Sequence, residues 1–180
     1  MARNVEIKAR LSETEFGQLR QAVLQLTTLA GILDQTDTFF DASKDRLKLR
    51  EFADGTAELI AYQRGNQTNA KLSDYVRVPI EHPQMLKESL ERSIGIRGIV
   101  KKRRELFMIG QTRVHLDDVQ ELGQFVELEV VLEAEQSQQM GQEIADELVC
   151  KLSIRPESFI SCAYMDLLEA ADDQNAKLSS

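Results

Sequence analysis

The sequence predicts an α+β fold in which eight antiparallel strands close into a barrel and about four helices pack outside it. Several segments alternate polar and apolar residues with the period of two that is typical of β-strands. In residues 125–132, for example, Glu127 and Glu129 fall on one face, and valine and leucine fall on the other. The predicted strands number about eight and are joined mostly by short turns, which favours a closed barrel or a strongly curled sheet.

The first half of the chain contains one predicted helix and five predicted strands. The segment Ser12-Glu13-Thr14-Glu15 has the form of a capping box and begins the helix. Apolar residues at helical spacing continue to Leu29, so Gly31 is the expected end of this helix. A turn at 41–45 and the pair Asp54-Gly55 indicate hairpins. The strands are expected at 3–10, 35–40, 46–52, 57–64 and 73–80, with a polar loop at 65–70.

The second half contains three predicted strands and three predicted helices. Pro83 stands at the favoured first-turn position of a helix that Gly95 ends. Gly110-Gln111 has the length of a two-residue hairpin turn. The strands are expected at 98–109, 112–116 and 124–132, and the other two helices at 137–152 and 156–168. We therefore expect one domain over residues 1–170 and a disordered polar tail at 171–180.

Composition limits the class of protein. A chain of 180 residues suits one domain with a sizeable core. It has no run of about 18 apolar residues, so no membrane span is expected, and its start lacks the apolar region of a signal peptide. The net charge of −8 argues against binding of nucleic acid or membrane surfaces. Cys150 and Cys162 are expected to be buried thiols rather than a disulfide, which fits the reducing cytoplasm.

Polar and charged residues repeat along one face of several predicted strands. On the first strand this stripe consists of Asn4, Glu6, Lys8 and Arg10. Similar stripes occur at 47–50 and 113–117. The common meaning of such a stripe is a solvated sheet face. The alternative is that the stripes line the inside of the barrel and form a cavity for a polyanion and its metal ions.

The charged residues of these stripes have the chemistry of a phosphate site. Arg presents a planar fork of donors that matches phosphate oxygens, and Lys presents a point charge. Lys102 and Arg104 fall on one face of their strand and Lys101 and Arg103 on the other, so either pair could face a cavity. Neighbouring strands would add Lys48, Arg50, Arg64 and Arg113. Hard oxygen ligands for Mg²⁺ or Mn²⁺ would come from Glu6, Glu127, Glu129 and, as a further candidate, Asp117.

Other polar and aromatic residues give weaker signals. Tyr62, Tyr75 and Tyr164 are interpreted as half-buried packing residues. His115 is interpreted as a surface or hydrogen-bonded histidine rather than a catalyst. The chain has no Gly-rich phosphate loop, zinc-ligand spacing or nucleophile elbow.

The segment Asn4-Val5-Glu6-Ile7-Lys8-Ala9-Arg10 resembles the opening Glu-x-Glu-x-Lys motif of the CYTH superfamily. That superfamily contains class IV adenylyl cyclases and thiamine triphosphatases, also called triphosphate tunnel metalloenzymes. The similarity covers about residues 3–168 and continues in order through 46–50, 59–64, 73–75, 100–107, 113–117 and 122–129. Asn4 departs from the motif, which has Glu there. An amide oxygen binds Mg²⁺ more weakly than a carboxylate does, so the number of metal ions stays open.

The resemblance implies an eight-stranded tunnel with Lys102 and Arg104 facing inward. The implied triphosphate-binding residues are Lys8, Arg10, Lys48, Arg50, Arg64, Lys102, Arg104 and Arg113. The implied ligands of Mg²⁺ or Mn²⁺ are Glu6, Glu127 and Glu129. Lys8 and Asp117 are the candidates for a catalytic proton acceptor.

The function expected from these residues and from the resemblance is metal-dependent processing of a triphosphate. The leading case is a class IV adenylyl cyclase, which converts ATP to cyclic AMP and pyrophosphate. A tripolyphosphatase or thiamine triphosphatase would use the same tunnel, and a non-catalytic module that binds nucleotide or polyphosphate is a third alternative. The expected partner is a nucleoside triphosphate or another triphosphate, with no nucleic acid and no membrane. The oligomeric state stays open, with a homodimer as one alternative.

Overall fold

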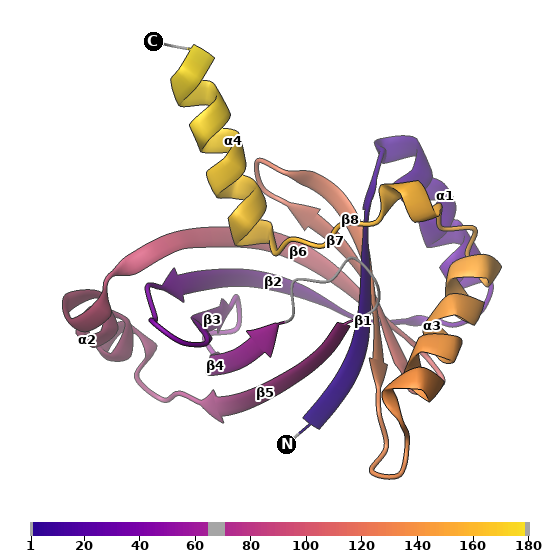
Figure 1. Ribbon diagram of the computed structural model, residues 1–180, viewed down its shortest axis with the longest axis horizontal. Coiled ribbons are helices and arrows are strands. Elements are labelled where there is room, and N and C mark those ends of the chain that lie inside the picture. The colour runs from indigo at the N-terminus through magenta and orange to yellow at the C-terminus, as the bar shows by residue number, and fades with distance from the viewer. Residues whose placement is uncertain (1, 65–70, 179–180) are drawn as a thin grey trace.

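The computed structural model describes residues 2–64 and 71–178, and within them the strands form a closed barrel (Figure 1). The strands are β1 (Ala2–Leu11), β2 (Leu29–Phe40), β3 (Arg46–Phe52), β4 (Ala57–Arg64), β5 (Lys71–Pro79), β6 (Ile96–Ile109), β7 (Thr112–Val119) and β8 (Gly123–Val131). Their order around the barrel is β1-β5-β4-β3-β2-β6-β7-β8, and each neighbouring pair is antiparallel. The predicted fold class is confirmed, whereas the predicted loop at 65–70 lies outside the described residues.

The first strand closes the barrel. β1 pairs with β5 through Asn4 and Ser73, and on its other side it pairs with β8. The β1–β8 register places Glu6 directly beside Glu129. Because residues of one parity face the inside of a barrel, this register brings the polar stripes of β1 and β8 together on the inner surface.

The outer face of β1, β7 and β8 is covered by two helices (Figure 1). These are α1 (Glu13–Leu24) and α3 (Gln138–Lys151), and the core beneath them is built from valine, leucine and isoleucine of the apolar stripes. Gly141 allows α3 to approach closely, because a Cβ there would lie 2.6 Å from Leu132 Cδ2 and 2.8 Å from Val5 Cγ2. A glycine within a helix is costly, and its use here is explained by this contact.

Two more helices lie at other parts of the barrel (Figure 1). Leu86 and Leu90 of α2 (Pro83–Ile94) pack against the core around Phe40 and Leu49. The helix α4 (Tyr164–Leu178) begins against the barrel and projects away from it. Its first residues join a core that includes Phe39 of β2, Val100 of β6 and Phe125 of β8. This attachment places Tyr164 at the inner surface.

The helix after Ser12 is shorter than the apolar spacing predicts. Its capping box is present, but α1 ends at Leu24, and Leu29 and Gly31 belong to β2. The predicted end at Gly31 is therefore wrong. Pairing with the 14-residue strand β6, in which Leu29 lies opposite Phe107, extends β2 toward its N-terminus. This shows that strand pairing outweighs local helical periodicity here.

The helix predicted at 156–168 begins later than predicted. Residues 156–163 contain one 3₁₀ turn, Pro156–Ser158, because Phe159 then bridges to Ala9 and the Ile160 amide donates to the Lys8 carbonyl at 2.9 Å. α4 begins at Tyr164, after the Ala163 amide donates to Asp166 Oδ2 at 3.0 Å. It continues to Leu178, through most of the segment for which composition predicts disorder.

The two cysteines are free, as expected, but both are exposed. The prediction that they are buried is wrong. Cys150 stands near the end of α3 on a face that the core does not cover, and Cys162 precedes α4. In the described part of the chain, none of the helices has the length and apolar character to cross a membrane.

Candidate functional site

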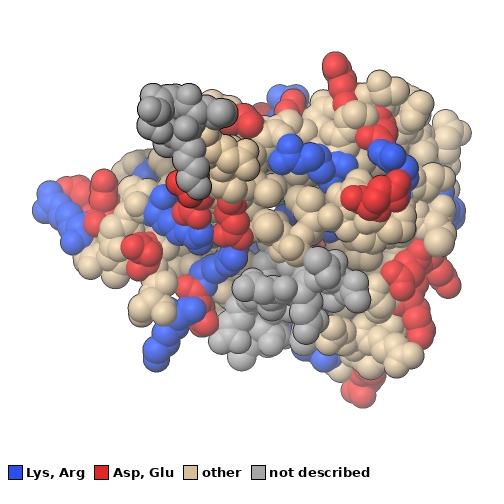
Figure 2. Space-filling view, turned by 45° about the horizontal axis from the view of Figure 1, so that its top comes forward, with Lys and Arg blue, Asp and Glu red and all other residues tan. Residues whose placement is uncertain are grey.

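The inside of the barrel is a cavity of about 340 Å³, lined by side chains from all eight strands and from the start of α4. The charged stripes face this cavity, and the apolar stripes face the helices. Lys102 and Arg104 line the cavity, whereas Lys101 and Arg103 are exposed on the outside. The interpretation of the stripes as a solvated sheet face is therefore wrong. On the outer face seen in Figure 2, basic and acidic side chains are interspersed.

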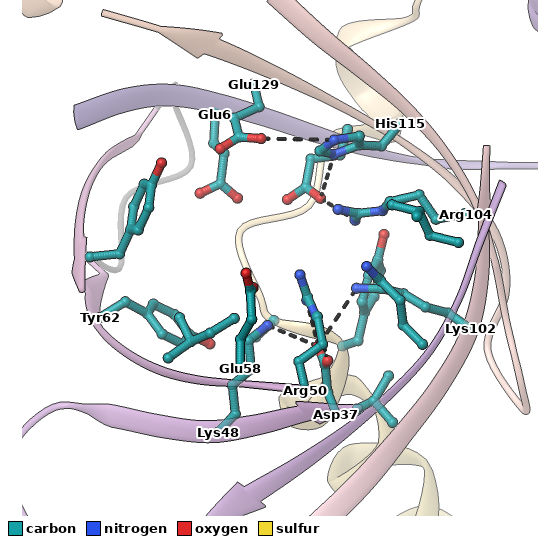
Figure 3. Close-up of a pocket in the computed structure, with 18 of the residues that line it drawn as sticks. Glu6, Asp37, Lys48, Arg50, Glu58, Tyr62, Lys102, Arg104, His115 and Glu129 are labelled. Carbon is teal, nitrogen blue, oxygen red and sulfur yellow. Dashed lines mark hydrogen bonds and ion pairs between the residues drawn. The ribbon is translucent and has the colours of Figure 1, made fainter. Parts of the chain in front are cut away.

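Four residues of the lining form a compact ion-pair group, called the Asp37 cluster below (Figure 3). It consists of Asp37, Lys48, Arg50 and Lys102. Arg50 donates through Nε to Asp37 Oδ1 and through Nη2 to Oδ2, both at 2.7 Å. Lys48 Nζ donates to the same Oδ2 at 2.8 Å, and Lys102 Nζ lies 3.7 Å from it. Three basic side chains thus share one carboxylate.

The electrostatics of the Asp37 cluster follow from its burial. Burial alone would raise the pKa of Asp37, but the charges of Arg50, Lys48 and Lys102 hold that pKa well below its usual range. Burial, together with the charge of Arg50, lowers the pKa of Lys48 to about 8, and Asp37 offsets only part of this effect. Burial and the charge of Arg104 lower the pKa of Lys102 as well. The pKa values of both lysines are therefore lowered, because one shared carboxylate does not offset the burial of these cations and the repulsion of the arginines.

Across the cavity, β1 and β8 form what we call the acidic wall: Glu6, Glu127 and Glu129 (Figure 3). Lys8 Nζ lies 3.3 Å from Glu127 Oε1. Arg113 Nη1 donates to Glu129 Oε1 at 3.2 Å, and Asn4 Nδ2 donates to the same oxygen. The acidic wall is therefore held by cations and an amide of its own side of the barrel.

A third group, the Arg104 network, lies at the end of the cavity near α4. Arg104 donates to both oxygens of Asp117 at 2.6 Å and to Glu127 Oε2 at 2.7 Å. The Tyr164 hydroxyl donates to Asp117 Oδ2 at 2.8 Å. Lys8 Nζ lies 4.1 Å from the centroid of the Tyr164 ring, a cation–π contact. This network joins the first residue of α4 to the interior of the barrel.

His115 lies between the acidic wall and Arg104. It is buried, in contrast to the surface alternative, with Nδ1 3.5 Å from Glu127 Oε2 and Nε2 3.8 Å from Glu129 Oε2. Burial, and then the charge of Arg104, lower the pKa of His115, while the neighbouring carboxylates oppose this. The neutral imidazole is therefore favoured, and it separates two of the acids of the wall.

Most of the predicted site residues line the cavity, but Arg10 does not. Those that line the cavity are Glu6, Lys8, Lys48, Arg50, Lys102, Arg104, Arg113, Glu127 and Glu129. Arg10 is exposed and outside the lining, with its guanidinium 5.0 Å from the centroid of the Phe125 ring. Arg64 belongs to β4, but its side chain lies outside the described residues.

Asp117 has a position that does not favour proton transfer. It is fully buried behind the lining, and both of its oxygens accept from Arg104. Burial would raise its pKa, but Arg104 holds the pKa well below the ordinary value. A carboxylate so strongly held is a poor proton acceptor, and this geometry suits the orientation of Arg104 instead.

Sequence reasoning missed several residues of the lining. Asp37, Glu58 and Arg77 were not singled out, and Tyr62, Tyr75 and Tyr164 were interpreted as packing residues although all three line the cavity. The alternation of Leu33, Gln35, Asp37 and Phe39 could have identified Asp37, because one parity of a barrel strand faces inward. Because this face carries both apolar and polar residues, it lacks the regular polar stripe that marks the other strands.

The acidic wall has the donor chemistry of a divalent cation site, although in the described residues no three His, Cys, Asp or Glu side chains form a preassembled metal cage. Asn4 Oδ1 is buried without a hydrogen-bond partner. It lies on β1 two residues before Glu6, next to Glu129, to which its amide donates. Amide and carboxylate oxygens are ligands that Mg²⁺ and Mn²⁺ accept. Asn4, Glu6 and Glu129 therefore fit such an ion by chemistry.

Comparison with solved structures supports this fold. A Pyrococcus horikoshii protein has a TM-score of 0.82 and 21% identity, with 91% of this chain and 98% of that chain covered. A candidate adenylate cyclase from Vibrio parahaemolyticus has a TM-score of 0.74 and 20% identity, with coverage of 92% and 97%. A Hippeastrum protein, described as a candidate adenylyl cyclase with a dominant triphosphatase activity, has a TM-score of 0.70 and 12% identity, with coverage of 95% and 96%.

The family is shown by a separate comparison. No curated protein matches the chain. The family model of the CYTH domain matches residues 2–164, which include every strand of the barrel and the residues that line its cavity. The chain belongs to the CYTH domain family.

Proposed function

We propose that the barrel binds a triphosphate and processes it with the help of a divalent cation. The observation that carries this proposal is the Asp37 cluster, in which the buried Lys102 and the half-buried Lys48 and Arg50 share one carboxylate. Such a group has an excess of positive charge in a place where water cannot screen it well. A bound polyanion supplies the missing negative charge, and Arg and Lys are the side chains that match phosphate oxygens.

The two sides of the cavity suit the two components of the proposed complex. The Asp37 cluster belongs to β2, β3 and β6, whereas the acidic wall belongs to β1 and β8 (Figure 3). A triphosphate between them would accept hydrogen bonds from Lys48, Arg50 and Lys102 on one side. Asn4, Glu6 and Glu129 would hold Mg²⁺ or Mn²⁺ on the other. When bound, such an ion would neutralise charge on the phosphates and polarise the reacting P–O bond.

ATP cyclisation is the leading reaction. The ribose 3′-oxygen attacks the α-phosphorus, the bond from that phosphorus to the bridging oxygen breaks, and pyrophosphate leaves with the bonding electrons. The hydroxyl proton must pass to a base. The leaving pyrophosphate is itself basic and can take that proton, because Lys48 is one of the cations that hold the phosphates and is needed in its protonated form. Arg50 and Lys102 would stabilise the charge that develops on the leaving group.

Hydrolysis of a triphosphate is the second candidate. Water attacks the terminal phosphorus, the bond to the bridging oxygen breaks with its electrons on the leaving phosphate group, and the proton of the water passes to the phosphate products. The cavity volume of about 340 Å³ favours this candidate, because it is near the lower end of the range for ligand pockets and suits a triphosphate chain. Tripolyphosphate and thiamine triphosphate are the substrates to test.

Product analysis separates these proposals. The purified protein is incubated with ATP, thiamine triphosphate or tripolyphosphate, each with Mg²⁺ and with Mn²⁺. Cyclic AMP with pyrophosphate identifies a cyclase, and orthophosphate identifies a triphosphatase. Saturable binding of all three without any product would identify a non-catalytic module. Absence of binding would contradict the proposal as a whole.

We expect Glu129→Gln to raise the concentration of Mg²⁺ or Mn²⁺ that gives half-maximal activity. The substitution removes a negative charge from the acidic wall and keeps nearly the same shape. The matched control is Glu105→Gln on β6, because Glu105 faces outward and pairs with Arg20 at 2.8 Å. Superimposable metal titrations for wild type and Glu129→Gln would show that Glu129 is not a ligand.

We also expect the free energy of unfolding of the empty protein to rise between about pH 8 and 10.5. In the folded state the pKa of Lys48 is lowered to about 8 from 10.5 by burial and by Arg50. Above pH 8 the unfolded chain therefore binds more protons than the folded protein does, so folding becomes more favourable as protons are removed. Urea unfolding at several pH values measures this slope. Lys48→Met should reduce it, and an equal slope in that variant would refute the role assigned to Lys48.

A further inference from the structure

We propose that Asp37 is a positioning residue for triphosphate binding. Its carboxylate holds Arg50, Lys48 and Lys102 in one array, although it would itself touch no phosphate. This inference rests on the proposed triphosphate binding. It states that Asp37, whose negative charge repels a polyanion, is nevertheless required for high affinity.

The geometry of the contacts supports this role. Arg50 is held at two points by Asp37, at 2.7 Å each, which fixes both the position and the plane of its guanidinium. In the strand register Asp37 lies directly opposite Arg50. The second oxygen of the same carboxylate also receives Lys48, so two of the three basic side chains of β3 are held by one residue of β2.

Burial makes the array dependent on this residue. Asp37 is 2% exposed, and the Lys102 side chain is 4% exposed. Among the side chains that the structure describes, those of residues 3–62 and 75–174, Asp37 is the one acid with an ion pair to Lys48, Arg50 or Lys102. Removal of its charge would leave three like charges next to one another, one of them buried and two half-buried. The lysines would respond by losing protons or by turning away from the arginine.

The net charge of the cavity and the positioning role of Asp37 predict opposite changes in the affinity for a polyanion when Asp37 loses its charge. If only the total charge of the cavity mattered, loss of any interior carboxylate would strengthen the binding of a polyanion. If Asp37 positions the array, loss of its carboxylate weakens that binding. Glu58 provides the comparison, because it lines the same cavity and lies opposite Arg50 in the strand register. Its ion pair is with Arg77, at 3.9 Å, and not with the Asp37 cluster.

The experiment is isothermal titration calorimetry of tripolyphosphate into the full-length protein, without metal and at constant ionic strength. Wild type, Asp37→Asn and Glu58→Gln are compared at pH 7.5. We expect Asp37→Asn to raise the dissociation constant by about tenfold or more, the loss typical of a charge-assisted contact. Glu58→Gln should leave the constant unchanged or lower it. Circular dichroism establishes that each variant is folded.

Asp37→Glu tests the same inference without a change of charge and keeps it falsifiable if Asp37→Asn does not fold. The added methylene displaces the carboxylate from its two-point contact with Arg50, so weaker binding is expected here too. The dissociation constant is also measured at several pH values, because a purely structural role of Asp37 would not change its pH dependence. The decline of affinity at alkaline pH, where Lys48 loses its proton, should begin at lower pH in Asp37→Asn.

The outcomes are distinct. Weaker binding in both Asp37 variants with unweakened binding in Glu58→Gln supports the inference. Wild-type affinity in Asp37→Glu, or equal changes in Asp37→Asn and Glu58→Gln, overturns it and leaves the proposed function intact. No saturable binding of tripolyphosphate to the wild type overturns the proposed function and this inference together.

Discussion

Arg104→Ala is expected to lower the free energy of unfolding by about 3–5 kcal/mol, the usual cost of removing one partner from a buried ion pair. Arg104 donates to both oxygens of Asp117 and to Glu127, and all three residues are buried. Without the guanidinium, Asp117 would remain in the interior without the cation that pairs with it, and Glu127 would keep only Lys8, whose Nζ lies 3.3 Å from its Oε1. Urea unfolding monitored by far-ultraviolet circular dichroism measures the difference.

The matched control is Arg103→Ala. Arg103 is the preceding residue on β6, points outward and lies 3.5 Å from Asp34 in an exposed ion pair. Its removal should change the free energy of unfolding by no more than about 0.5 kcal/mol. Equal losses in the two variants would contradict the importance of the buried network.

The effect of Arg104→Ala should also depend on pH. Burial would raise the pKa of Asp117, but Arg104 holds it below the value of 3.8 that the unfolded chain has. The resulting stabilisation is present above that value and is lost as the pH falls through the folded-state pKa. The difference between wild type and Arg104→Ala should therefore shrink at acidic pH.

The second large effect is expected from the ligand itself. Tripolyphosphate that binds only the folded barrel should stabilise it by about 2.7 kcal/mol at a hundredfold excess over the dissociation constant. For a domain of this size, that corresponds to a rise in melting temperature of roughly 5–10 °C. Differential scanning fluorimetry with tripolyphosphate, orthophosphate and sulfate at equal ionic strength tests this. Equal shifts for tripolyphosphate and sulfate would indicate general screening and contradict a specific site.

Lys102→Met separates the ligand effect from the stability of the empty barrel. Burial and the charge of Arg104 lower the pKa of Lys102, so its charged form is disfavoured in the folded protein. We expect the variant to melt at a higher temperature without ligand and to lose most of the shift with tripolyphosphate. A lower melting temperature of the empty variant would show instead that the distance of 3.7 Å to Asp37 represents a stabilising ion pair.

Much of the barrel could be predicted because the period-2 stripes are regular. Alternation alone placed Lys102 and Arg104 on one face and Lys101 and Arg103 on the other, but it could not say which face is inside. The resemblance of the strand motifs to the CYTH superfamily resolved that choice, and the burial of Lys102 and Arg104 agrees with it. Closure of the barrel depends on the pairing of β1 with both β5 and β8, which is a long-range property.

What could not be predicted depends on partners distant in the sequence. The importance of Asp37 is visible only when β3 and β6 bring Lys48, Arg50 and Lys102 to it. Asp117 has the sequence signature of a cavity carboxylate, yet Arg104 and Tyr164 take up its oxygens behind the lining. Local spacing likewise gave no sign that β2 would begin at Leu29, since its partner strand lies about 70 residues later.

The distribution of aromatic residues gives the protein an optical property. The chain has no tryptophan and three tyrosines, and all three tyrosines line the cavity. Near-ultraviolet tyrosine absorbance and fluorescence therefore originate only from the interior of the barrel. The fluorescence intensity of a tyrosine side chain depends on the charges around its ring. Lys8 Nζ and Lys102 Nζ lie 4.1 and 5.3 Å from the centroid of the Tyr164 ring. Occupancy of the cavity can thus be followed spectroscopically in the unlabelled protein, without a dye or an introduced fluorophore.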